Sequence, residues 1–219
     1  EQEQRRQCKD GDDGEDAETL LKHADNAMYL AKEAGGNTWR FFNPALAEDA
    51  VERLNLEVEL RRALERNEFR LHYQPKIDLA DGRINALEVL LRWQHPVRGL
   101  LAPGAFLKVA KESGMMVDIG NWVTHAAARQ AVAWSDMGLP VPVSVNVDGS
   151  QLSRDLLSQL VTEVIGSSGL MPTQLGLEIT ETAIMEQPGS VVEKLATIRA
   201  LGVRIYIDDF GTGHSSLSR

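Results

Sequence analysis

The 219-residue sequence contains a single cysteine, Cys8, which lies in a polar N-terminal stretch. One cysteine excludes an internal disulfide framework and a C-x-x-C metal or redox motif. No apolar run approaches the roughly 18 residues that a membrane-spanning helix needs, and the charged start, Glu1 to Arg6, does not resemble a signal peptide. We therefore expect a cytoplasmic location. Because the chain lacks an initiator methionine, it looks like an internal piece of a longer protein, which leaves room for an upstream membrane anchor.

An excess of basic charge is also lacking. The chain has 23 Lys and Arg residues against 32 Asp and Glu residues, a formal net charge of −9. This balance argues against a nucleic-acid polymer or an anionic membrane as partner, and it remains compatible with a local basic pocket for a small anionic ligand. The content of 43% hydrophobic and 25% charged residues is ordinary for a globular protein.

Several familiar catalytic motifs do not occur. The glycine-rich segment Gly211-Thr212-Gly213 lacks the lysine and the spacing of a phosphate-binding P-loop. There is no G-x-S-x-G nucleophile motif and no H-E-x-x-H zinc motif. The five histidines are scattered along the chain, which favours surface or core-edge positions over a shared metal site: His23, His72, His95, His125 and His214.

The pattern along the chain predicts three parts. An acidic loop (1–16) precedes a helix that begins at Ala17 and stops at Gly35-Gly36, and Trp39–Phe42 is typical of a short strand. A second helix, Leu46 to about Asn67, has the composition of a connector. We accordingly predict an N-terminal segment, a connecting helix and a main domain, with the boundaries 1–43, 44–67 and 68–219.

The main domain is predicted to be an incomplete barrel. The runs Phe69–Gln74 and Ile84–Trp93 flank a turn at Asp81-Gly82, which indicates an antiparallel pair. Helical stretches, the first of them from about Pro103 to Ser113, then alternate with three further strands, which signals βα units and a parallel sheet. A closed TIM barrel needs roughly 250 residues, whereas about 150 follow Phe69. The predicted fold class is α/β, an incomplete TIM-like (β/α) barrel with an antiparallel first strand; the three later strands are Val141–Val147, Leu175–Thr180 and Val203–Asp208.

Polar side chains stand at or near the C-terminal ends of four of these strands, where parallel β/α folds assemble their active sites. Their carboxylate and amide oxygens suit hard cations such as Mg²⁺, Mn²⁺ or Ca²⁺. Two such ions could activate a water molecule and neutralise charge on a phosphoryl group. The adjacent carboxylates of the last pair would repel each other without a cation between them. These residues are Glu88, Asn146, Glu178 and Asp208, with Asp209.

The spacing by itself leaves other interpretations open. A single acidic residue at a strand end is commonly a helix cap or a member of an ion pair, and Asp209 could cap the next element. Arg92 lies on the same strand face as Glu88, where it could hold a phosphate or pair with an acid. Gln74, which precedes Pro75, is equally ambiguous.

Five motifs, in this order and spacing, resemble the EAL domain family from about Asp49 to Arg219. EAL domains are metal-dependent phosphodiesterases that linearise the bacterial messenger cyclic di-GMP to 5′-pGpG. The D-D-F-G-T-G-x-S-S-L run is the most distinctive of the motifs. They are Tyr73-Gln74-Pro75, Glu88-Val89-Leu90-Leu91-Arg92-Trp93, Ser144-Val145-Asn146-Val147, Leu177-Glu178-Ile179-Thr180-Glu181 and Asp208-Asp209-Phe210-Gly211-Thr212-Gly213-His214-Ser215-Ser216-Leu217.

The resemblance implies a role for each matched residue. Asp209 would serve a second metal ion and the nucleophilic water, and Glu181 would hold the loop 210–216. Gln74 and Arg92 would contact the guanine and the phosphate of cyclic di-GMP. The cofactors would be two Mg²⁺ or Mn²⁺ ions, and the ligands of the first would be Glu88, Asn146, Glu178 and Asp208.

Residues 15–42 are similar to the last helix and strand of a GGDEF, or diguanylate cyclase, domain, whose catalytic part would lie upstream. The N-terminal segment would then be a helix-strand remnant of that α/β domain. The resemblance also implies an upstream sensory domain in the parent chain and a homodimer formed through the EAL domain.

The sequence departs from the family pattern at several points. The signature tripeptide is Glu-Val-Leu, His214 stands where tyrosine is usual, and Asp148 stands where serine is common. The later lysine and the general-base glutamate of the family do not occur in this chain. We therefore expect a cyclic di-GMP phosphodiesterase in the parent protein and little activity from these 219 residues alone. The alternative is a degenerate EAL module that binds cyclic di-GMP or a protein partner as a sensor.

Overall fold

The computed structural model describes residues 16–33, 39, 42, 44–152, 156–186 and 188–211. The chain divides into two compact units, 1–58 and 59–219. In the first unit, α1 (Ala17–Glu33) begins at the predicted residue and buries Ala24 and Ala27. The buried ring of Phe42 stacks on His23, with 3.6 Å between the ring centroids. Most of the predicted acidic loop and strand falls outside the described residues, and the proposed boundaries at 43 and 67 stay predictions.

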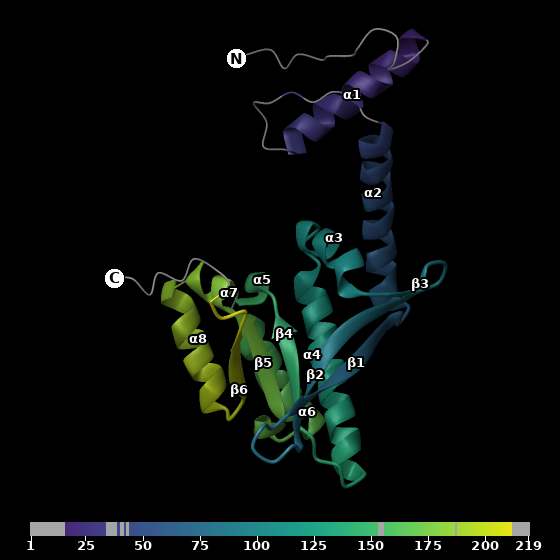
Figure 1. Ribbon diagram of the computed structural model, residues 1–219. Coiled ribbons are helices and arrows are strands. Elements are labelled where there is room, and N and C mark those ends of the chain that lie inside the picture. Colours follow the sequence, from purple (N-terminus) through teal and green to yellow (C-terminus); the bar gives the residue numbers. More distant parts are fainter. Residues whose placement is uncertain are drawn as a thin grey trace. The chain divides into compact units, whose positions relative to one another are not determined.

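A mixed sheet forms the second unit (Figure 1). The strand order is β1-β2-β4-β5-β6, and the short strand β3 pairs with the last residues of β2. The strands β1 and β2 are antiparallel, whereas β2, β4, β5 and β6 are parallel to one another. The antiparallel first strand and the parallel sheet are confirmed, but β3 was not predicted. The strands are β1 (Phe69–Ile77), β2 (Ile84–His95), β3 (Gly99–Leu101), β4 (Val143–Val147), β5 (Leu175–Thr180) and β6 (Arg204–Asp208).

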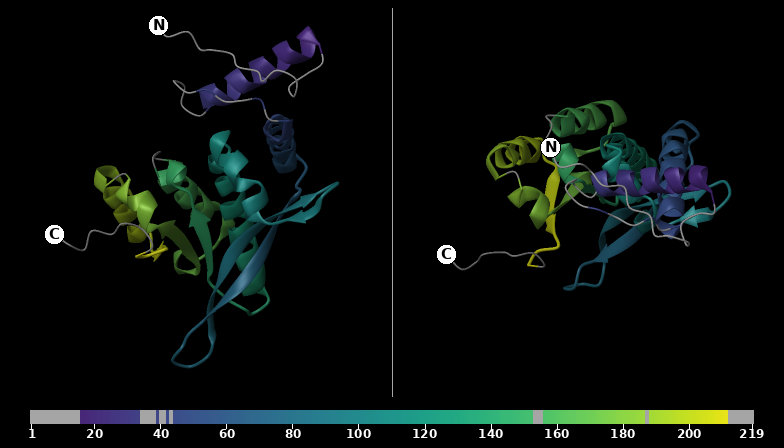
Figure 2. Two further views of the ribbon diagram at one scale, coloured as in Figure 1. Left: turned by 45° about the horizontal axis from the view of Figure 1, so that its top comes forward. Right: turned by 90° about the horizontal axis from the view of Figure 1, so that it is seen from above.

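Helices follow the strands and lie along one side of the sheet (Figure 2). The predicted helix 103–113 is broken at Phe106, whose φ of −138° is not helical, into a 3-10 turn and a short α-helix. No helix among the described residues is long and apolar enough to cross a membrane. The elements are α2 (Pro44–Glu65), η1 (Pro103–Ala105), α3 (Leu107–Glu112), α4 (Met116–Asp136), α5 (Gly149–Leu152), α6 (Leu156–Ser168), η2 (Pro172–Gln174), α7 (Glu181–Met185) and α8 (Pro188–Ala200).

The face of the sheet that the helices cover, which we call the outer face, is the core of the unit. Successive side chains of a strand point to opposite faces, and the outer-face positions of β4 and β5 are apolar and buried. Leu177 and Ile179 are fully buried, and Val145 is 1% exposed. Burial of each such side chain stabilises the fold by about 1.5–3 kcal/mol. The residues between them must therefore point to the opposite side of the sheet, which we call the inner face.

The sheet curls around its inner face. The ammonium of Lys76 in β1 forms an ion pair with Glu178 in β5, although β2 and β4 lie between these strands. In a flat sheet, three strand spacings would separate the two backbones by about 14 Å, and both side chains would stand roughly perpendicular to the sheet, which would leave them too far apart for an ion pair. The sheet is therefore an arc, as expected for the TIM-like barrel fold.

Candidate active site on the inner face

The register of the parallel strands brings the predicted site residues to one face. Asn146 is paired with Glu178, Glu88 with Ser144, and Thr180 with Asp208. Residues that are paired across strands share a face, and so do residues two apart on one strand. The four side chains of Glu88, Asn146, Glu178 and Asp208 thus project from four neighbouring strands onto the inner face.

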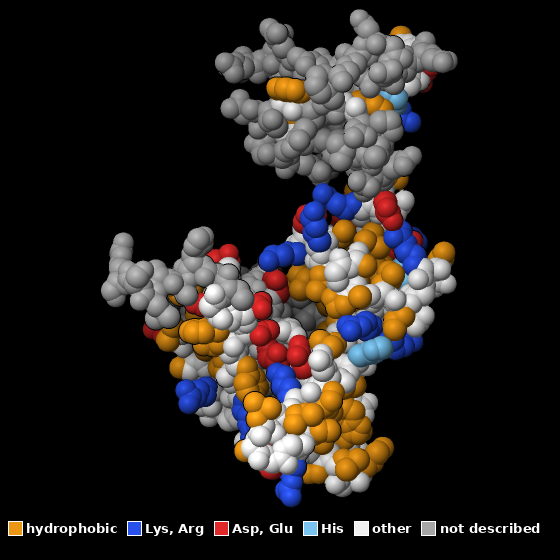
Figure 3. Space-filling model, viewed as in Figure 1, with side chains coloured by type: hydrophobic (Ala, Val, Ile, Leu, Met, Phe, Trp, Pro, Cys, Tyr) orange, Lys and Arg blue, Asp and Glu red, His pale blue; other side chains and the backbone are white. Residues whose placement is uncertain are grey.

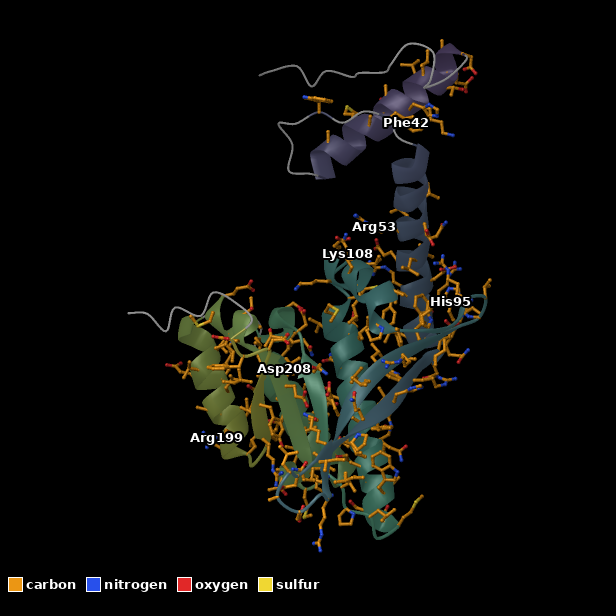
Figure 4. The ribbon with its side chains drawn as sticks, in the orientation of Figure 1. Phe42, Arg53, His95, Lys108, Arg199 and Asp208 are labelled. Atoms are coloured by element: carbon orange, nitrogen blue, oxygen red, sulfur yellow. The ribbon has the colours of Figure 1, made fainter. Side chains whose placement is uncertain are left out.

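Direct contacts join part of this set. Asn146 Nδ2 donates a hydrogen bond to Glu88 Oε1 at 3.1 Å. Glu178 is only 5% exposed and pairs with the ammonium of Lys76. Asp208 is exposed at the end of β6 (Figure 4). Acidic side chains gather around a hollow at the centre of the face shown in Figure 3.

The chemical type of these donors fits a hard divalent cation, because carboxylate and amide oxygens are the ligands that Mg²⁺ and Mn²⁺ prefer. Their present arrangement is more open than a metal site. Within the part of the chain that the structure describes, no three His, Cys, Asp or Glu side chains are grouped so that they could hold an ion. The Glu178 carboxylate is occupied by Lys76 instead.

Beyond β6, the chain turns sharply at the second aspartate. Asp209 has a φ of 55°, a left-handed conformation that is uncommon for residues other than glycine. Gly211 N donates to Glu181 Oε2 at 2.9 Å, so the start of α7 is tied to the start of the following loop. Thr180 Oγ1 caps α7 by accepting a hydrogen bond from Ala183 N at 3.3 Å. The rest of the loop, from residue 212 on, lies outside the described residues.

The two residues predicted to contact the substrate, Gln74 and Arg92, lie on the antiparallel strands β1 and β2. Gln74 is paired with Glu88, so the two share the inner face. Arg92 is also on this face, and its guanidinium donates to Leu91 O at 2.7 Å. The structure therefore places both residues on the inner face, and the Arg92 guanidinium is turned to the backbone of its own strand.

Three further residues of the inner face were missed by the sequence reasoning: Lys76, Ser144 and Tyr206. The buried Ser144 Oγ has no hydrogen-bond partner among the described residues. Tyr206 lies across Gly176, where a Cβ added to the glycine would come within 2.6 Å of the ring. The sequence could have indicated them, because each lies two residues from a predicted site residue on its own strand and therefore points to the same face.

Asp148, one of the departures from the family pattern, has a structural role. Its carboxylate accepts a hydrogen bond from Ser150 N at 2.8 Å and lies 3.6 Å from Lys111 Nζ. Burial opposes its ionisation, but the hydrogen bonds from Ser150 and the charge of Lys111 outweigh burial and lower the pKa of Asp148 below its ordinary value of 3.8. Gln151 Oε1 accepts a hydrogen bond from Asp148 N at 3.0 Å.

Comparison with known proteins identifies the family. The sequence pattern of the EAL domain matches residues 57–219. The chain belongs to the EAL domain family. Similar EAL proteins include the cyclic di-GMP phosphodiesterase PdeR of Escherichia coli (37% identical, covering 94% of this chain and 31% of PdeR). Another is the bifunctional diguanylate cyclase/cyclic di-GMP phosphodiesterase MucR of Pseudomonas aeruginosa (41% identical, covering 94% of this chain and 30% of MucR).

The fold of this EAL chain is similar to that of a solved structure, the PaMucR phosphodiesterase in complex with c-di-GMP. The two share 41% sequence identity with a TM-score of 0.71 over 74% of this chain and 66% of that one. This likeness confirms the fold class. The chain spans about a third or less of the length of the curated relatives described above.

Proposed function

We propose that the full-length protein hydrolyses a phosphodiester bond of cyclic di-GMP to give 5′-pGpG, with Mg²⁺ or Mn²⁺ as cofactor. The observation that carries the proposal is the set of oxygen donors on the inner face, which comes from four neighbouring strands. Membership of the EAL family and the phosphodiesterase names of PdeR and MucR support it.

The proposed roles of the residues are those that the family resemblance implies, and the positions of the residues on the inner face support them. The inner-face set Glu88, Asn146, Glu178 and Asp208 would hold one ion, and Asp209 would contribute to a second. Bound metal supplies charge neutralisation and an activated water molecule. Glu181 would keep the aspartate-bearing turn in place through its bond to Gly211, while Gln74 and Arg92 would bind the guanine and the phosphate from the antiparallel pair.

We further propose that residues 1–43 are the end of a GGDEF domain. The match with MucR, which is named a diguanylate cyclase as well as a phosphodiesterase, covers 94% of this chain and so extends into the residues before Glu57. An upstream sensory domain, a cytoplasmic location and a homodimer formed through the EAL domain belong to the same proposal.

The test is to incubate the full-length protein with cyclic di-GMP and Mg²⁺ or Mn²⁺ and to follow pGpG. We expect product that is lost on chelation of the metal and lost in Glu88→Ala. Tight binding of cyclic di-GMP by well-folded protein without metal-dependent product would instead establish the sensor alternative. The 219-residue chain assayed alone is expected to give no product.

A further inference from the structure

We propose that Lys76 is the resident counter-ion of the EAL site, which holds the Glu178 carboxylate in place in the absence of metal and gives up its position to a divalent cation. The proposal rests on the proposed function, because it concerns the same carboxylate. It makes Lys76 a positioning residue that sets the affinity of the site for metal.

The first observation is the burial of Glu178. Its side chain is 5% exposed, and an ionised carboxylate at that depth costs several kcal/mol unless a partner compensates its charge. The ammonium of Lys76 is that partner. The same ammonium lies 5.1 Å from the centroid of the Tyr206 ring, where the face of the ring attracts a cation.

The backbone directs Lys76 to this place. The register between β1 and β2 shifts between Lys76 and Ile77, and such irregularities re-aim side chains. On the opposite side of the arc, Tyr206 is paired with Glu178. Tyr206 can extend toward β4 because Gly176 has no side chain. Lys76 therefore contacts both a carboxylate and an aromatic face that belong to strands remote from its own.

The exchange of Lys76 for a metal ion follows from the positive charge that both carry. A metal ion on Glu178 and the Lys76 ammonium in its present position would be two cations within a few ångströms of each other, and they would repel strongly in a partly buried site. Lys76 can withdraw, because its side chain is 32% exposed and its long apolar stem can carry the ammonium toward solvent. Metal binding then has to displace Lys76, and the apparent affinity is reduced by the fraction of time that Lys76 is paired.

The test measures Mn²⁺ affinity of the full-length protein by electron paramagnetic resonance. Lys76→Met keeps the stem and removes the charge, and we expect its Kd for Mn²⁺ to be about tenfold lower than that of the wild type, the value for a site that Lys76 occupies nine-tenths of the time. Lys76→Arg should stay within about threefold of the wild type. Lys108→Met is the matched control, because it removes the same charge from the exposed surface of α3 (Figure 4) and should leave the Kd unchanged.

A second measurement needs no variant. Labelling of lysines with an acylating reagent, read by mass spectrometry, should increase several-fold at Lys76 when Mn²⁺ saturates the wild-type protein and should not change at Lys108. An unchanged or higher Kd in Lys76→Met, or labelling of Lys76 that does not respond to Mn²⁺, would overturn the proposal. If the wild type binds no Mn²⁺ at all, the proposed metal-dependent function fails instead, so the two failures are distinguishable.

Discussion

The two faces of the sheet are built from alternate residues of the same strands, yet they have opposite chemistry. The outer face of β5 carries Leu175, Leu177 and Ile179, all fully buried under helices. The inner face of the same strand carries Gly176 and Glu178, beside the polar residues of β4 and β6. Stability and function are thereby assigned to different faces of one sheet. Substitutions on the outer face should lower stability, whereas substitutions one residue away on the inner face should lower activity.

The largest effect should come from the inner face. Glu88→Gln keeps the shape of the side chain and its hydrogen-bonding capacity toward Asn146, but it removes a charged ligand. Because a bound metal contributes several kcal/mol to stabilisation of the transition state, we expect the rate of pGpG formation to fall by about 10³-fold. The midpoint of urea unfolding should stay close to that of the wild type. A variant that unfolds much more easily would contradict the separation of the two faces.

A substitution on the outer face should lower stability and leave the rate nearly unchanged. Leu177→Ala deletes a fully buried side chain from the centre of β5, and cavities of this kind cost about 2–5 kcal/mol. Urea unfolding followed by circular dichroism measures the loss. The rate of pGpG formation per folded molecule should remain within a few-fold of the wild type, and a loss of rate as large as that of Glu88→Gln would contradict the separation of the two faces.

His95 tests the same separation of the two faces, because it is a polar residue on the outer face. It is 2% exposed, its Nε2 lies 3.1 Å from Glu59 Oε2 on α2, and its Nδ1 accepts hydrogen bonds from Val97 N and Arg98 N at 3.1 Å each. His95→Ala leaves these groups without their partner, so the free energy of unfolding should fall by about 1–3 kcal/mol. His125→Ala is the control.

The smallest effect should come from Asp148, an acidic residue near the site that the structure assigns to stability. Its pKa is lowered in the folded state, so its stabilising contribution is present above the unfolded-state value of 3.8 and is lost as the pH falls through the folded-state pKa. Asp148→Asn should cost less than about 1 kcal/mol at neutral pH. In thermal melts between pH 6 and 3, its difference from the wild type should shrink as the pH falls, and a constant difference would contradict the assignment.

Most of the sheet could be predicted from the sequence, because the outer-face positions of the strands are regularly apolar. Runs such as Val143–Val147 and Leu175–Thr180 alternate apolar and polar residues, and their spacing implies parallel strands. The pairing of β3 with β2 was missed, since three residues carry no detectable alternation. The break at Phe106 was missed as well, because its cause is tertiary packing: Phe106 is fully buried against Phe69 and Trp93.

The site was predictable to a similar degree. The positions of Asn146, Glu178 and Asp208 near the ends of β4, β5 and β6 could be inferred from spacing. The prediction of a strand end was wrong for Glu88, because β2 continues to His95. The partnership of Lys76 with Glu178 could not, because it depends on the curvature of the sheet across two intervening strands. The left-handed conformation of Asp209 was equally hidden, since a local sequence of two aspartates does not specify its backbone angles.

The most direct test uses two neighbours on β5. The rates of Mn²⁺-dependent pGpG formation from cyclic di-GMP are measured for Leu177→Ala and Glu178→Gln in the full-length protein at equal concentrations of folded molecule. We expect Leu177→Ala to retain a rate within a few-fold of the wild type, whereas Glu178→Gln should lose about 10³-fold. Equal rates in the two variants, or product formation by Glu178→Gln at the wild-type rate, would contradict the assignment of catalysis to the inner face.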